Sequence, residues 1–312
     1  SGHPASSPAR ADAAAPDGRA AMVHSSTAAR LQEPLRVSLH GVGGRELQLD
    51  LDPQSKVCEV KQRIAEAWEV PPLVQRLVAG QAVLGDSEVL ASHCRPEKLT
   101  LTILVVVSAA ELDQDLEHPD WQRRKAALQA LVYMGARGGV EIVEPLMVRL
   151  EDHDSDVRRA ALEALPNVVK KGDKTAIAAI CTLFEDGSTT VKRAAVRALA
   201  QVAERGDKYA VASVIERLDH SDAHVRCTAL EALTKVADRG DEYTVTAVDK
   251  LCRDDEGNVR LAALHALLQV AKEGDGRAIS AVRTGLFDGN AFVRRSASEK
   301  VAELGVAVCA VM

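Results

Sequence analysis

Two histidines four residues apart have the spacing most suggestive of chemistry in this sequence. His220 and His224 stand beside Asp219 and Asp222, and imidazole and carboxylate groups on one helix face are typical zinc ligands. Asp222 also directly precedes an apolar helical pattern, where its carboxylate would cap the start of the helix. The cap would fall between the two histidines, which then need not share a face. We therefore predict no metal site.

The remaining sequence contains no recognisable catalytic arrangement. It has no G-x-S-x-G, Walker or dinucleotide-binding glycine pattern, and no Cys/His constellation. The adjacent carboxylates Asp254 and Asp255 fall in a loop between expected helices, where solvated side chains are the simpler interpretation. We therefore predict that the protein is not an enzyme and binds no cofactor.

Cysteine usage and apolar runs indicate the environment of the chain. The six cysteines are scattered and form no C-x-x-C motif: Cys58, Cys94, Cys181, Cys227, Cys252 and Cys309. They indicate reduced thiols in a reducing compartment, the cytoplasm or nucleus. No run of 18 apolar residues occurs, so we expect no membrane insertion. Residues 1–33 are rich in Ala, Ser and Pro and are predicted to be disordered; a targeting remnant, with organelle import, and a start at Met22 stay open.

A basic residue recurs every 34 residues in the second half of the chain: Arg124, Arg158, Lys192, Arg226, Arg260 and Arg294. Such a column could bind a row of phosphates, as on a nucleic acid. The formal net charge of −6 argues against this function, because proteins that neutralise nucleic acids usually carry a basic excess. We interpret the column as structural, each residue pairing with acidic or capping residues nearby, and expect no nucleic-acid partner.

Other residues keep the same period, which is typical of a stack of helix pairs. Gly172-Asp173 recurs as Gly-Asp at 206–207, 240–241 and 274–275. In each unit we expect a capping residue before the first helix, a glycine in a left-handed turn that ends it, and an aspartate that caps the second helix. Pro166 is expected to kink its first helix. The residues expected to cap the first helices are Asp120, Asp154, Ser188, Asp222 and Asn290.

The recurring run D-x-D-V-R-x-A-A-L-x-A-L resembles a HEAT repeat and is similar to the short type found in phycobilisome lyase subunits. The aromatic and Gly-Tyr pattern of tetratricopeptide repeats is absent. The resemblance covers residues 113–307, as five helix pairs and a half repeat, and an apolar tail follows at 308–312. It implies an all-α solenoid that binds other proteins. The alternatives are a lyase-type accessory factor for cofactor attachment or complex assembly, and an architectural subunit of a large complex.

Residues 35–107 show a different pattern. Apolar residues alternate with polar ones around Gly41-Val42-Gly43-Gly44, which predicts a β-hairpin, and helical spacing follows from Val57 to Trp68. The stretches LDLDP (49–53), VKQRI (60–64), VPPLVQRLV (70–78) and LTLTIL (99–104) resemble ubiquitin. The expected fold class is therefore multidomain, with an N-terminal ubiquitin-like β-grasp (α+β) domain before the all-α HEAT solenoid.

The resemblance to ubiquitin has two functional implications. Ubiquitin ends in a Gly-Gly tail that conjugating enzymes activate, whereas Ser108-Ala109-Ala110 stands at that place here, so we expect no conjugation of the ubiquitin type. The apolar patch that ubiquitin receptors bind falls on Val42, Val78 and Leu104, which predicts a docking surface. The alternative is that these side chains pack on the helical domain.

Positions that vary between repeats are candidates for partner contact, because the repeated positions are needed for stacking. In the second helices one such column contains Tyr209, Tyr243 and Arg277, and Tyr and Arg are frequent interface anchors. A later column contains Val148, Glu216 and Lys250, with Arg283 beside its last member. We expect second helices to line the concave face; the alternative is that the tyrosines cover the next repeat. The predicted function is a non-enzymatic adaptor for protein partners of unknown identity.

Overall fold

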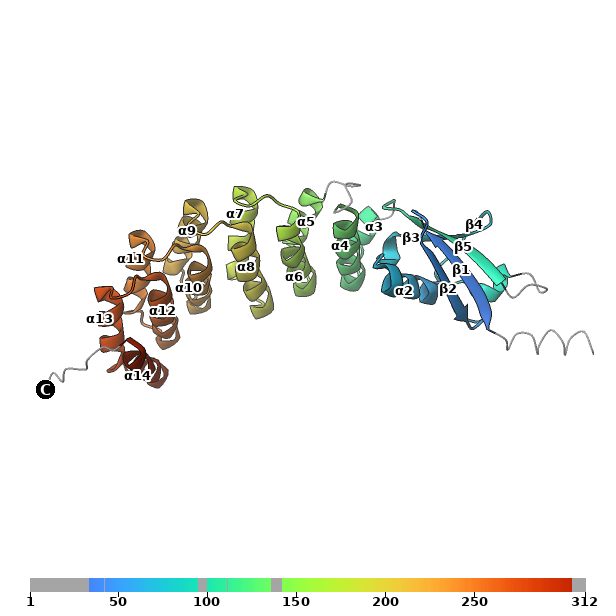
Figure 1. Ribbon diagram of the computed structural model, residues 1–312. Helices are drawn as coiled ribbons and strands as arrows, with labels where there is room; N and C mark the ends of the chain where they lie inside the picture. Colours follow the sequence, from blue (N-terminus) through green and yellow to red (C-terminus); the bar gives the residue numbers. More distant parts are fainter. Residues whose placement is uncertain (1–33, 42, 95–99, 111, 136–141, 305–312) are drawn as a thin grey trace, which may run out of the picture. The chain divides into compact units, whose positions relative to one another are not determined.

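The computed structural model describes residues 34–41, 43–94, 100–110, 112–135 and 142–304, and it divides into two compact units between Ser108 and Ala109. The first unit is an α+β unit and the second is all-helical (Figure 1). Segment 1–33, predicted to be disordered, the apolar tail 308–312 and Val42 lie outside the described residues.

A five-stranded sheet in the order β2-β1-β5-β3-β4 forms the first unit. Strands β1 and β5 run parallel, and the pairs β1–β2, β3–β5 and β3–β4 run antiparallel. The strands are β1 (Leu35–Gly41), β2 (Glu46–Leu51), β3 (Gln75–Ala79), β4 (Ala82–Val83) and β5 (Thr100–Val107). Helix α2 (Val57–Trp68) and the 3₁₀ turns η1 (Pro72–Val74) and η2 (Leu90–His93) connect them.

The apolar alternation of the first unit places one face of its sheet in a core. Val37, Leu39 and Ile103 are fully buried, and the buried residues of α2, Val57, Val60 and Ile64, belong to the same cluster. The residues that alternate with these buried ones along each strand lie on the other face of the sheet, so this face stays accessible. This is the β-grasp arrangement expected from the sequence.

The second unit is a stack of two rows of helices. The inner helices are α4 (Trp121–Gly135), α6 (Ser155–Ala164), α8 (Thr189–Val202), α10 (Ala223–Val236), α12 (Gly257–Val270) and α14 (Ala291–Leu304). The outer helices are α3 (Leu112–Leu116), α5 (Val143–Arg149), α7 (Lys174–Thr182), α9 (Lys208–Ile215), α11 (Glu242–Leu251) and α13 (Gly276–Gly285). Three 3₁₀ turns follow α6, α7 and α9: η3 (Leu165–Asn167), η4 (Leu183–Glu185) and η5 (Glu216–Asp219).

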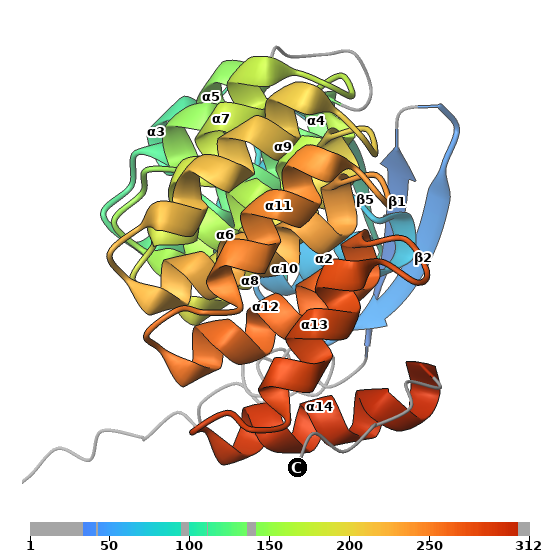
Figure 2. The same ribbon diagram turned by 90° about the vertical axis from the view of Figure 1, so that its left-hand side faces the viewer.

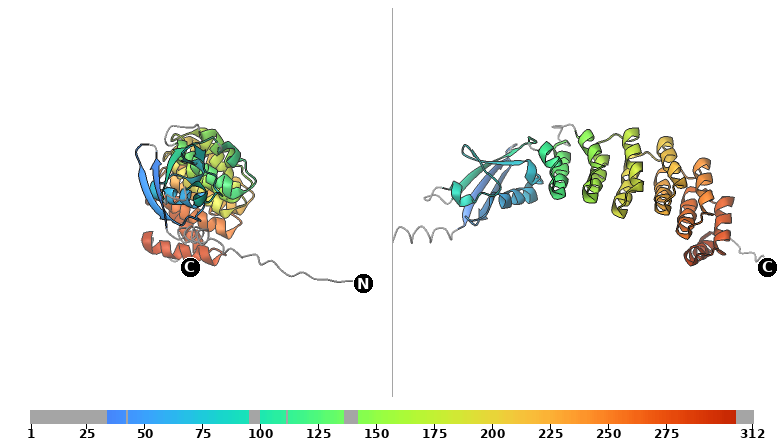
Figure 3. Two further views of the ribbon diagram at one scale, coloured as in Figure 1. Left: turned by 90° about the vertical axis from the view of Figure 1, so that its right-hand side faces the viewer. Right: turned by 180° about the vertical axis from the view of Figure 1, so that it is seen from behind.

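The two rows differ in how closely successive helices pack. Successive inner helices pack closely against one another, whereas successive outer helices touch less, and the row curves toward the inner helices in Figure 1. Figure 2 looks along this stack, and the right-hand panel of Figure 3 shows it from behind. The expectation that the second helix of each unit lines the concave face is therefore wrong, because those helices are the outer row.

Pro166 shortens its helix instead of kinking it. Helix α6 ends at Ala164 and continues as the 3₁₀ turn η3, whereas α8, α10 and α12 each have 14 residues. Proline lacks the N–H that would bond to the carbonyl of Leu162, and its ring crowds that carbonyl. The predicted kink is therefore wrong.

The recurring glycines connect neighbouring repeats. Gly172, Gly206, Gly240 and Gly274 have positive φ, as expected. They do not end their helices directly, since α8 is capped by Ala203, three residues before Gly206. Instead the Gly206 N–H donates to the carbonyl oxygen of Val236 in the next inner helix, at 2.7 Å. Gly172 and Gly240 make the equivalent bonds to Val202 and Val270.

Most predicted helix caps are confirmed. The Asp154 carboxylate accepts the N–H groups of Asp156 and Val157, and Asp173 accepts that of Ala176. Ser188 is the exception, because its hydroxyl bonds to Thr190 and not to the helix backbone. The other confirmed caps are Asp120, Asp207, Asp222, Asp241, Asp275 and Asn290.

Candidate interaction surfaces

The arginine column joins consecutive repeats. Arg158 donates from Nε and Nη2 to the two carboxylate oxygens of Asp186, at 2.6 and 2.9 Å. Its Nη1 donates to the carbonyl oxygens of Asp152 and His153 in its own repeat. The same two-pronged pairing joins Arg124 to Asp152, Arg226 to Asp254 and Arg260 to Asp288. The structural interpretation of the column is confirmed for these four arginines.

These ion pairs are mostly shielded from water. The side chains of Arg158 and Asp186 are 16% and 5% exposed. Hydrogen bonds from Arg260 hold the pKa of Asp288 below its usual range. Guanidinium groups used in this way are not available to bind phosphates, because two of their nitrogens are directed at a carboxylate.

One repeat junction of the arginine column has no ion pair among the described residues. Lys192 takes the place of arginine, and the residue that stands where the other repeats have the accepting aspartate is His220. Lys192 makes no ion pair with any residue that the structure describes. The His220 Nδ1 accepts the backbone N–H of Asp222 at 3.0 Å, as Asp186 does for Ser188. The junction between α8 and α10 therefore lacks the charged bridge of its neighbours.

The thiols of the helical unit are poorly suited to chemistry. Burial raises the pKa of Cys181 to about 11 and that of Cys252 to about 12. A thiol rather than a thiolate then predominates at neutral pH, and only the thiolate is a strong nucleophile. In the described part of the chain no three His, Cys, Asp or Glu side chains form a group that could hold a metal ion.

The tyrosine column lies at the start of the outer helices. Tyr209 is 38% exposed, and the Lys174 ammonium lies 5.6 Å from the centroid of its ring, so a neighbouring repeat partly covers it. Tyr243 is 61% exposed. Arg277 is held by Glu242 and Asp275, both at 2.9 Å. Of the three, Tyr243 has the most accessible surface for a partner.

The later column runs along the same outer row. Val148 is 52% exposed, and Glu216, Lys250 and Arg283 are exposed as well. Glu216 lies 3.6 Å from Arg217. These side chains change from apolar to acidic to basic along the row, so no single partner chemistry fits the whole column.

The accessible face of the first unit carries two of the predicted docking residues. Val78 pairs with Leu104 across β3 and β5, and with Val83 across β3 and β4. Leu104 is 48% exposed and Val83 is 61% exposed. The sheet therefore brings Val78 and Leu104 side by side and adds Val83, which sequence reasoning missed because its strand is only two residues long.

A family model for HEAT repeats matches residues 110–200, 177–267 and 211–303, which together span more than half of the chain. The chain belongs to the HEAT-repeat family. The match is to HEAT repeats in general, so the finer likeness to the lyase-type repeat stays a prediction. None of the described helices has the length and apolar character needed to span a membrane.

The first unit is similar to ubiquitin-like proteins. It is 38% identical over 45 residues to ubiquitin-like protein NEDD8 of Dictyostelium discoideum, and 39% identical over 51 residues to ubiquitin-like protein 1 of Schizosaccharomyces pombe. These matches span 14% and 16% of this chain, and 58% and 65% of the relatives' own length. A ubiquitin-like region followed by HEAT repeats is a general protein-interaction architecture.

Two solved structures show similar parts. An engineered protein matches 63% of this chain and 96% of its own length, with 20% identity and a TM-score of 0.38. Caldiarchaeum subterraneum ubiquitin matches 24% of this chain and 94% of its own length, with 19% identity and a TM-score of 0.22.

Two exposed phenylalanines in the last HEAT repeat also escaped the sequence reasoning. Phe287, two residues after the end of α13, is 86% exposed, and Phe292 near the start of α14 is 67% exposed. A signal for Phe287 existed, because the equivalent residues of earlier repeats are charged: Glu185, Asp219 and Arg253. An aromatic residue in a charged column marks a surface position that stacking does not require.

Proposed function

We propose that this HEAT-repeat protein is a non-enzymatic adaptor that binds protein partners through two separate surfaces. One surface is the outer row of the helical unit, centred on Tyr243. The other is the accessible sheet face of the ubiquitin-like unit, centred on Leu104. Two modest sites on one chain can hold an assembly more tightly than either site alone.

The observation that carries this proposal is the separation of repeated from variable residues. The repeated residues are occupied within the stack, as the buried Arg158–Asp186 pair and the Gly206–Val236 hydrogen bond illustrate. The variable residues of the outer row are the accessible ones, and Tyr243 among them is 61% exposed. Accessible aromatic side chains at positions that stacking does not require favour partner contact.

The ubiquitin-like unit supports the second surface. Val78, Leu104 and Val83 form an accessible apolar row across three strands. The chain continues through Ser108-Ala109-Ala110 where ubiquitin has its Gly-Gly tail. A docking module that is not conjugated fits both features.

The test is quantitative affinity purification from source-cell extract with the full chain and two variants, Leu104→Glu and Tyr243→Glu. A charge that would be buried in the complex at either surface should lower the amount of the proteins captured there tenfold or more. The amount of the proteins captured at the other surface should not change. Gln201→Glu adds the same charge to an exposed position of an inner helix and serves as the control. Circular dichroism and melting temperature must show that each variant is folded.

Two outcomes would contradict the proposal. In the first, all variants retain the same proteins in the same amounts, so neither surface binds a partner. In the second, Leu104→Glu and Tyr243→Glu lose one identical set, so the two surfaces do not act separately.

A further inference from the structure

Two grooves between neighbouring outer helices occupy equivalent places in the 34-residue period, one between α3 and α5 and one between α11 and α13. Residues of the first groove and of the second occupy the same columns, four periods apart in sequence. The first is lined by Asp113, Leu116, Glu117, Glu144, Pro145 and Val148. The chain therefore offers two versions of one groove, with different side chains.

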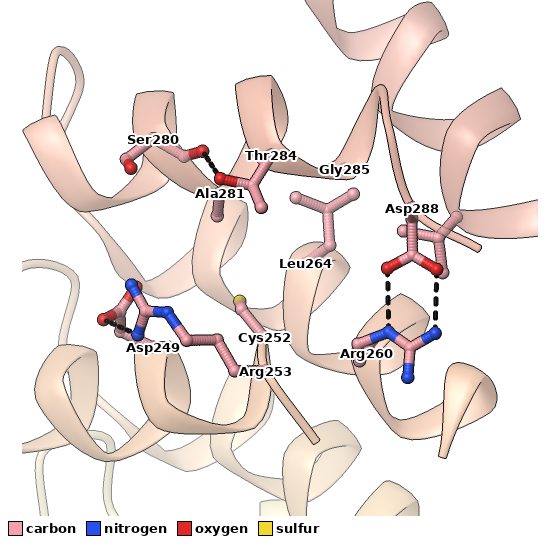
Figure 4. A pocket seen from close by; sticks show the side chains of 11 residues that line it. Asp249, Cys252, Arg253, Arg260, Leu264, Ser280, Ala281, Thr284, Gly285 and Asp288 are labelled. Carbon is pink, nitrogen blue, oxygen red and sulfur yellow. Dashed lines mark hydrogen bonds and ion pairs between the residues drawn. The ribbon is translucent and has the colours of Figure 1, made fainter. Parts of the chain in front are cut away.

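The groove between α11 and α13 is filled by its own side chains (Figure 4). Arg253 pairs with Asp249 of α11 at 3.4 Å along one side of it, and Arg260 of α12 pairs with Asp288 at 2.7 Å at another part of its lining. Cys252 occupies the place of Leu116. Only about 30 Å³ remains open there, whereas about 260 Å³ is open between α3 and α5.

The α3–α5 groove has an apolar floor and an acidic rim. Leu116 forms the floor, and Val148 is 52% exposed beside it. Asp113, Glu117 and Glu144 are exposed and pair with no basic side chain that the structure describes. Residues equivalent to Glu144 in the later repeats are uncharged: Ala178, Ala212, Thr246 and Ser280. The positions equivalent to Glu117 are acidic in three later repeats: Glu151, Glu185 and Asp219. Glu144 is therefore the acid of this groove that has no acidic equivalent in a later repeat.

The one basic residue among the lining side chains is already engaged. Arg149 donates from Nη1 to the carbonyl oxygen of Leu116 at 2.8 Å and lies 3.7 Å from Asp152. A hydrogen bond to a carbonyl oxygen leaves the positive charge of Arg149 in place, so the charged side chains that line the groove carry a net charge of −2. Salt screens charges beyond about 8 Å at physiological ionic strength, so the three nearby carboxylates dominate the field that a ligand in the groove would meet.

We propose that the α3–α5 groove binds a partner segment that carries an aliphatic side chain next to lysine or arginine. The aliphatic group covers Val148 and Leu116, and the basic group pairs with the carboxylates of the rim. The same carboxylates repel phosphates, so a nucleic acid does not fit. This assignment rests on the proposed adaptor function, since it names the partner chemistry for one part of the outer row.

The test measures fluorescence anisotropy of a labelled twelve-residue peptide of alternating leucine and lysine with the full chain. The triple variant Asp113→Asn, Glu117→Gln, Glu144→Gln keeps the side-chain shapes and should weaken binding at least tenfold. Val148→Ser should weaken it about threefold, because about one apolar side chain loses part of its burial. A triple variant of exposed acids elsewhere, Glu204→Gln, Glu231→Gln, Glu273→Gln, removes the same charge and should change binding less than twofold.

Each contrary result has a distinct meaning. Equal weakening by both triple variants would show general attraction to an acidic protein and would overturn the assignment. Unchanged binding in Val148→Ser would show that the apolar floor does not contact the peptide, and it would overturn the aliphatic part of the assignment. If sedimentation shows a dimer that the Asp113–Glu117–Glu144 variant dissociates, a second copy occupies the groove and the assignment to a partner segment is wrong. Failure of the peptide while Tyr243-dependent proteins are still captured would overturn this inference alone.

Discussion

The ion pairs of the arginine column should contribute measurably to the stability of the stack of repeats. Replacing Arg158 with Met keeps the apolar stem but leaves the Asp186 carboxylate with only the N–H of Ser188. Removing one partner of a fully buried ion pair costs about 3–5 kcal/mol. Because the Arg158 side chain is 16% exposed, we expect about 2–4 kcal/mol after partial screening by solvent.

The chain contains a matched control for this change. Arg294 donates from Nη1 to the carbonyl oxygens of Asp288 and Gly289, as Arg158 does in its own repeat, but it has no ion-pair partner among the described residues. Arg294→Met should therefore cost less than about 1 kcal/mol. Urea denaturation followed by circular dichroism gives both values, and hydrogen exchange locates the loosened junction. Equal costs for the two variants would refute the idea that the bridge to the next repeat carries the energy.

The double variant Lys192→Arg, His220→Asp should create the missing ion pair and raise the free energy of unfolding in urea by about 1–3 kcal/mol. Either change alone should raise it by less than half of this. The Arg260 guanidinium lowers the pKa of Asp288. The stabilisation of the folded state by this ion pair should therefore be complete above about pH 4, and it should be lost as pH falls through the lower folded-state pKa of Asp288. Circular dichroism between pH 2 and 7 would follow this loss. Burial raises the pKa of Cys252 to about 12, so iodoacetamide at pH 8 should modify exposed Cys58 but not Cys252 until the chain unfolds, as peptide mass mapping would show.

Much of the fold could be predicted because its signals are periodic. Alternation around Val37 and Leu39 indicated the buried face of the sheet, and the 34-residue period indicated the helix pairs. The structural role of Arg158 was also predictable, because a basic column on an acidic protein needs acidic neighbours. The aspartates that pair with these arginines could also be found in the sequence, since an aspartate follows each of four arginines by 28 residues.

Features that depend on three-dimensional packing could not be predicted in this way. A period assigns residues to columns, but it does not say which row of helices packs more closely, so the second helices were placed on the wrong face. The effect of Pro166 depended on whether the neighbouring structure would follow a kinked helix or accept a shorter one. The α3–α5 groove was missed because Asp113 and Glu144 are ordinary exposed acids in sequence and become a rim only when α3 and α5 stand side by side.

We expect one chain to bind two proteins at once through separate surfaces. Sedimentation velocity of the full chain mixed with one protein lost in Leu104→Glu and one lost in Tyr243→Glu tests it most directly. We predict a ternary complex in the wild type and a binary complex in each variant. Displacement of one protein by the other, with no ternary complex, would show that the two surfaces do not bind partners at the same time.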